Sequence, residues 1–97
     1  MNPQGRWNVV IETPVGPRSG VLELLVNGDE LSGTLSDGEQ TTPILEGRIV
    51  DGTLQWSARI TRPLRMSFRF TATVDADTIS GSAKYLLGRA HFSGVRA

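Results

Sequence analysis

The 97-residue sequence contains no cysteine and a single histidine, His91. Disulfide bridges and thiolate metal sites are therefore excluded, and so is a metal site built from several histidines. The apolar runs are short, and none approaches the ~20 residues of a membrane-spanning helix or the apolar core of a signal peptide. We accordingly expect no metal or other cofactor, no membrane span and a cytoplasmic location, with secretion as the alternative if a signal peptide has been removed.

The chain also lacks an excess of either charge. Ten basic and ten acidic residues give a formal net charge of zero. Binding to nucleic-acid phosphates requires a basic surplus, so we expect no nucleic-acid partner. A chain of this length forms one domain, 1–97, whose stability must come from a continuous core and from strand pairing.

What the sequence does contain is a repeated alternation of apolar and polar residues, the period of two that a half-buried β-strand requires. The pattern is strongest between Met66 and Val74, where Phe68 and Phe70 alternate with polar residues. Turn residues separate eight such segments, predicted as strands over 5–13, 19–26, 30–35, 42–50, 53–60, 66–74, 78–83 and 89–96. Helix should be scarce, because no window has a helical period.

Prolines and glycines predict the connections between these strands. Pro14 and Pro17 should keep their loop out of the sheet. Longer loops are expected over 14–19, 36–41, 62–65 and 84–89, and tight turns over 27–29, 51–52 and 75–77. In the fourth strand, the alternation predicts that Leu45, Gly47 and Ile49 point inward.

The two halves of the chain resemble each other. Segment 29–34 (DELSGT) aligns with 77–82 (DTISGS), and 45–47 (LEG) aligns with 92–94 (FSG). Each half is therefore a predicted four-stranded meander, and eight antiparallel strands can close into a barrel whose interior side chains fill or nearly fill. We predict an all-β fold, a closed eight-stranded antiparallel up-and-down barrel made of two four-stranded repeats with little or no helix.

The stretch Gly5-Arg6-Trp7, at the head of the first strand, resembles the Gly-x-Trp motif of the calycin superfamily, the lipocalins, avidins and fatty-acid-binding proteins. The resemblance implies a tryptophan at the closed end of the barrel, packed against a basic residue of the last strand, and Arg96 matches that residue. Trp7 and Arg96 are therefore expected to close the barrel through a cation–π contact. The helix-free layout of the avidins is the nearer comparison, because the sequence has no lipocalin-type disulfide.

The connections divide the predicted barrel into two ends. Tight turns and five of the ten acidic residues lie at one end, whereas the longer loops and the basic residues Arg18, Arg62, Arg65, Lys84 and Arg89 lie at the other. We predict that the basic end is the mouth of a site for a small apolar or amphipathic anionic molecule. The candidate ligand-binding residues are Trp56, Met66, Phe68, Phe70, Tyr85, Arg62, Arg65 and Arg89.

Two other functions fit the same barrel. One is an enzyme of the cyclase or isomerase type, in which the cavity confines the substrate and Tyr85 and Thr13 are the polar groups near the mouth. The other is a barrel filled by its own side chains that serves only in assembly. The sequence has no Ser-His-Asp order, metal-ligand spacing or phosphate-binding glycine loop, so we assign no catalytic residue.

Several residues are expected on the outer surface. His91 alternates with Phe92 and should point outward. Val10, Val21, Leu25 and Ile44 should also point outward, which is more apolar outer surface than a monomer needs. We therefore expect a homo-oligomer, a dimer or tetramer, formed by face-to-face packing of sheets.

Overall fold

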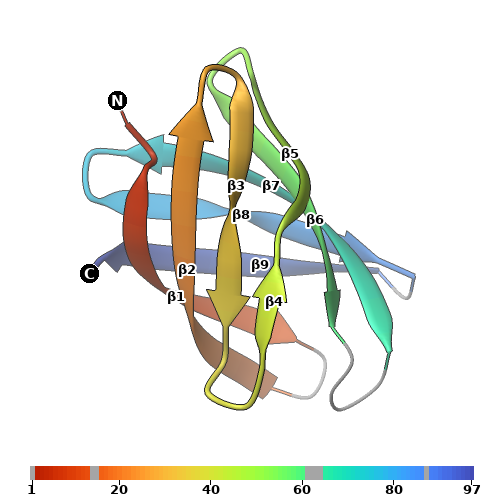
Figure 1. Ribbon diagram of the computed structural model, residues 1–97. Helices are drawn as coiled ribbons and strands as arrows, with labels where there is room; N and C mark the ends of the chain where they lie inside the picture. Colours follow the sequence, from red (N-terminus) through yellow and green to blue (C-terminus); the bar gives the residue numbers. More distant parts are fainter. Residues whose placement is uncertain (1, 14–15, 61–64, 87) are drawn as a thin grey trace.

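The computed structural model describes residues 2–13, 16–60, 65–86 and 88–97, which form one antiparallel sheet (Figure 1). Its strands are β1 (Gly5–Thr13), β2 (Gly16–Asn27), β3 (Glu30–Ser36), β4 (Thr41–Pro43), β5 (Leu45–Val50), β6 (Thr53–Ile60), β7 (Met66–Asp75), β8 (Thr78–Tyr85) and β9 (Gly88–Arg96). None of the described residues lies in a helix, and no helix among them could cross a membrane.

Eight of these strands form a closed ring. β1 pairs with both β2 and β9, and β2 pairs with β3, which joins the two ends of the sheet. The short β4 lies outside the ring and is hydrogen-bonded to β3. Trp7 is opposite Arg96 in the β1–β9 ladder, so the two chain ends lie side by side (Figure 1). The predicted closed eight-stranded barrel is therefore confirmed, and closure leaves the ring without exposed edge strands.

The fourth predicted strand, 42–50, is interrupted in the structure. Ile44 separates β4 from β5 and donates its N–H to the Gly33 carbonyl at 3.0 Å. A bulge follows, because the ladder runs from Leu45 to Arg48 on β5 but only from Ser57 to Gln55 on β6. Glu46 lies within this bulge and has a left-handed φ of 53°. One inserted residue reverses the alternation of the strand.

The bulge explains two wrong predictions about side-chain direction. Ile44 is not on the outer surface but in the core, at 7% exposure, and Leu45 is not in the core but 37% exposed. Gly47 and Ile49, beyond the bulge, are half-buried as the alternation predicts. The proposed match of 45–47 with 92–94 therefore fails, since Phe92 is buried where Leu45 is exposed.

The other repeated segment does occupy equivalent places. Segments 29–34 and 77–82 both lead from a tight turn into a strand, β3 or β8, and Leu31 and Ile79 are both buried. The glycine two residues later lies against a neighbouring strand in each case. A Cβ at Gly33 would overlap a carbonyl oxygen of β2, and one at Gly81 would overlap a carbonyl oxygen of β7. Glycine permits this close approach, and with it the strong coiling of a small barrel.

Two of the connections are shorter than predicted. The β1–β2 ladder extends to Thr13 and Gly16, and the β8–β9 ladder extends to Tyr85 and Gly88, so residues 16–19, 84–85 and 88–89 belong to strands. Pro17 lies in the part of β2 that precedes its ladder with β3, where a missing N–H is tolerated. The predicted loops over 14–19 and 84–89 are therefore wrong. Residues 37–40 do form a connection, and most of 62–65 lies outside the described residues.

Candidate ligand-binding site

Trp7 and Arg96 close one end of the barrel. The guanidinium carbon of Arg96 lies 4.2 Å from the centre of the Trp7 ring, and Trp7 is fully buried at 0% exposure. This is the geometry of a cation–π contact, which contributes about 0.5–2 kcal/mol depending on its exposure to water. The contact expected from the calycin-like motif is therefore confirmed.

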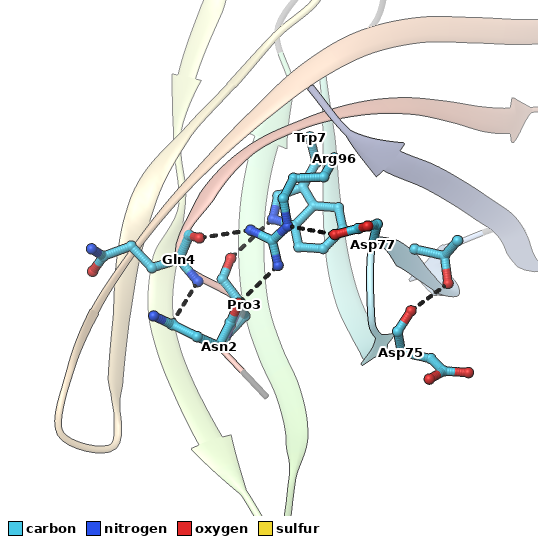
Figure 2. A network of polar contacts seen from close by, with 8 residues as sticks. Asn2, Pro3, Gln4, Trp7, Asp75, Asp77 and Arg96 are labelled. Atoms are coloured by element: carbon cyan, nitrogen blue, oxygen red, sulfur yellow. Dashed lines mark hydrogen bonds and ion pairs between the residues drawn. The ribbon is translucent and has the colours of Figure 1, made fainter.

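The segment before β1 completes the closed end, as Figure 2 shows. Arg96 donates from Nη1 to the Gln4 carbonyl at 2.9 Å and from Nη2 to the Asn2 carbonyl at 3.0 Å. Its Nε lies 3.4 Å from a carboxylate oxygen of Asp77. The indole N–H of Trp7 donates to the Pro3 carbonyl at 2.9 Å. The chain's own first residues thus occupy this end, which leaves the opposite end as the candidate entrance.

Aromatic side chains occupy the middle of the barrel. Trp56 and Phe70 are stacked, with ring centres 5.1 Å apart and 9° between the ring planes. Phe92 meets both rings edge-on, at 6.0 and 5.5 Å. Phe68 extends the cluster toward the open end, where its ring centre lies 5.2 Å from that of Tyr85. The structure therefore brings four candidate residues together and adds Phe92. The alternation of apolar and polar residues predicted that Phe92 lies inside the barrel, but not that it lies beside Trp56.

The two buried tryptophans differ in one respect. The indole N–H of Trp7 is bonded to Pro3, whereas that of Trp56, whose side chain is 2% exposed, has no hydrogen-bond partner in the described part of the chain. Burying such a donor without a partner costs about 1–3 kcal/mol. Most buried polar side-chain groups have a partner. Nε1 of Trp56 therefore marks a point inside the barrel where a hydrogen-bond acceptor is missing.

The open end has a partly buried apolar lining. Met66 at the start of β7, Tyr85 at the end of β8 and Ile11 of β1 are half-buried against the core. Arg65 directly precedes β7 and is exposed. Arg89 is also exposed and lies on the outer side of β9, because the adjacent Ala90 is buried. The candidate residue Arg62 lies outside the described residues.

Arg18 is the one described cation near the mouth that has an acidic partner. Its Nη2 lies 3.4 Å from Asp37 Oδ2, and Asp37 Oδ1 accepts the backbone N–H groups of Glu39 and Gln40, each at 3.0 Å. Partial burial alone would raise the pKa of Asp37, but the two N–H groups and the Arg18 charge together lower it below its ordinary value of 3.8. Arg18 and Asp37 therefore stabilise the β3–β4 connection.

Other cations near the open end have no ion pair with a described residue. Arg69, Lys84 and Arg89 form an exposed row across β7, β8 and β9, because Arg69 is opposite Lys84 and Lys84 is opposite Arg89. The described ion pairs instead involve Arg6, Arg18 and Arg96. Like charges placed opposite each other on neighbouring strands repel. The row therefore raises the positive potential beside the mouth at some cost in stability.

An open concavity lies on the outside of the barrel. It crosses β1, β2, β8 and β9 and includes 36–38 at the end of β3, and its apolar side chains are mainly Val10, Val21 and Val95. Val10 is 37% exposed and Val95 is 54% exposed. The candidate subunit interface therefore includes Val95, which the sequence reasoning missed, and excludes the buried Ile44.

The polar groups considered for catalysis or metal binding, Thr13, Tyr85 and His91, lie on three different strands, β1, β8 and β9. His91 is exposed on β9, as predicted, and is opposite Ser82. Thr13 donates its hydroxyl to the Gly16 carbonyl at 2.6 Å. Among residues 2–13, 16–60, 65–86 and 88–97, no three acidic or histidine side chains are grouped so that they could hold a metal ion.

Comparison with solved structures identifies the same architecture. A redesigned β-barrel, mFAP1, solved bound to DFHBI, superposes with a TM-score of 0.67 and 15% sequence identity, covering 97% of this chain and 94% of that chain. The chain has the fold of a small closed β-barrel. No protein-family model and no curated protein matches it.

Proposed function

We propose that this calycin-like barrel binds a small apolar or amphipathic anionic molecule, whose apolar part enters at the open end. The anionic group is held at the edge by Arg65, together with Arg62, and the positive charge of Arg89 on the outer side of β9 attracts it. The observation that carries the proposal is the combination at this end of half-buried apolar side chains, Met66 and Tyr85, with cations that have no acidic partner among the described residues.

The electrostatics of the two ends support this orientation of the ligand. The closed end carries acidic residues in its turns, including Asp29, Asp51 and Asp77, and its cation, Arg96, is already held by Trp7 and Asp77. The open end carries exposed cations beside an apolar lining, which attracts an anion and also receives a hydrocarbon tail. The related architecture of mFAP1, which was solved bound to the small molecule DFHBI, is consistent with a ligand in a barrel of this size.

The proposal is tested with decanoate and with the fluorescent anion anilinonaphthalene sulfonate. We expect the dye to bind with enhanced, blue-shifted emission and decanoate to displace it. Because a hydrogen bond to a charged group contributes about 1.5–3 kcal/mol, Arg65→Ala should weaken decanoate binding about tenfold or more if Arg65 contacts the carboxylate.

Two variants serve as controls. Arg48→Ala removes an exposed arginine of β5 that has no ion pair with a described residue, and it should leave decanoate binding unchanged. Val95→Asp places a charge in the outer concavity and should also leave binding unchanged if the ligand lies inside the barrel. Absence of binding by either anion contradicts the proposed function, and equal losses in Arg65→Ala and Arg48→Ala contradict the role of the cations at the mouth.

A further inference from the structure

We infer that the molecule held by the barrel carries an uncharged hydrogen-bond acceptor, such as a ketone or ester oxygen, which receives the indole N–H of Trp56. The inference rests on the proposed function and adds the chemistry of the ligand's buried part. It starts from the one buried side-chain donor of the described residues that has no partner.

The rings that pack on Trp56 belong to side chains without a hydrogen-bond acceptor. One face of its ring is stacked on Phe70, and the ring of Phe92 meets it edge-on. The same register row continues from Phe70 to Ala83 and then to Ala90. Phenylalanine and alanine side chains have no lone pair to accept a hydrogen bond. A rotamer change in Phe70 or Phe92 therefore cannot satisfy the N–H, whereas an incoming molecule with an acceptor can.

The same surroundings define the shape of that molecule. The inward positions Ala58, Ala83 and Ala90 carry small side chains, so they contribute little volume to the barrel interior. The aromatic rings beside them offer faces and edges suited to stacking with a planar group. A planar conjugated ketone is therefore a closer match to this part of the barrel than a saturated chain.

The acceptor should be neutral. The described core contains one buried polar residue, Thr42, and otherwise only apolar side chains. An ionised group in such surroundings would lose its hydration without a countercharge, which is far more costly than burying a carbonyl. The exposed cations lie near the mouth, so an anionic group stays there while a neutral oxygen reaches Trp56.

The test compares two dyes, prodan, a dimethylaminonaphthalene with a ketone, and dimethylaminonaphthalene without that ketone. A neutral hydrogen bond corresponds to about a three- to tenfold change in affinity. The affinity for prodan divided by the affinity for the matched dye should therefore be larger in the wild-type protein than in Trp56→Phe, by about that factor. Trp7→Phe, which alters the tryptophan at the closed end, should keep the wild-type ratio.

A second measurement uses only the wild-type protein with isotope-labelled tryptophan. Prodan should move the indole N–H resonance of Trp56 downfield, by more than the matched dye does, and leave that of Trp7 in place. Either single variant assigns the two signals. If the dyes bind but the ratio is the same in Trp56→Phe, or the Trp56 signal responds equally to both dyes, the inference is overturned while the proposed function stands. If these dyes, decanoate and anilinonaphthalene sulfonate all fail to bind, the proposed function is overturned as well.

Discussion

Replacing Arg96 with alanine should remove the contacts that tie together the two ends of the chain. The loss includes the cation–π contact with Trp7 and the hydrogen bonds to the carbonyl groups of Gln4 and Asn2. The side chain of Arg96 is 30% exposed, so we take about 1–2 kcal/mol for the cation–π contact and about 0.5–1 kcal/mol for each partly solvated hydrogen bond. The ion pair with Asp77 adds little, because the Asp77 side chain is 85% exposed. Arg96→Ala should therefore lower the free energy of unfolding by about 2–4 kcal/mol, a large part of the stability of a small domain.

The assay is urea unfolding followed by tryptophan fluorescence, with the free energy taken from the midpoint at constant slope. Arg6→Ala is the matched control. Arg6 lies on the neighbouring strand and pairs with Glu23 at 2.6 Å, but the two side chains are 64% and 46% exposed. Its loss should cost about 0–1 kcal/mol. The reasoning is refuted if Arg96→Ala and Arg6→Ala are destabilised equally, because the closed end would then depend on neither the indole contact nor the carbonyl groups.

Four further predictions concern stability, pH and assembly. Gly81→Ala should cost about 3 kcal/mol or more in chemical denaturation, because its Cβ would overlap a carbonyl oxygen of β7. The lowered pKa of Asp37 means that its ionised form stabilises the fold above the ordinary pKa of 3.8 and that this contribution is lost as the pH falls through the lower folded value. Acid unfolding of Asp37→Asn should lack that component. Lys84→Glu should raise the thermal midpoint, gaining about 0.2–1 kcal/mol for each neighbouring arginine that it attracts. We also predict a homo-oligomer through the outer concavity, so light scattering should give more than one chain for the wild type and one chain for Val95→Asp; a monomeric wild type contradicts this.

Period-two alternation predicted much of this fold, because in a strand each step along the chain reverses the direction of the side chain. It placed Phe68, Phe70 and Phe92 inside and His91 outside, all of which the structure confirms. The Gly-x-Trp motif and an arginine near the end of the last strand predicted the contact between Trp7 and Arg96. The side-chain directions depend only on the order of residues along a strand. The Trp7–Arg96 contact depends on the pairing of the first and last strands, which the motif and the strand count predict.

The sequence could not reveal features that depend on a single inserted residue or on contacts across the barrel. The bulge after Ile44 reversed the faces of Ile44 and Leu45, since nothing in Leu45-Glu46-Gly47 marks a left-handed φ at Glu46. Pro17 entered β2 because the β2–β3 ladder begins only at Val21. The position of a bulge and the tolerance of a proline depend on which strand pairs with that segment, and the tertiary structure determines this pairing.

The sequence by itself therefore determined a barrel with a Trp7–Arg96 closure and an aromatic interior. Only the tertiary structure decided that Trp7 has an acceptor for its N–H whereas Trp56 has none among the described residues. The physical reason is that hydropathy governs burial residue by residue, but the pairing of a buried donor depends on atoms brought together from strands far apart in the chain.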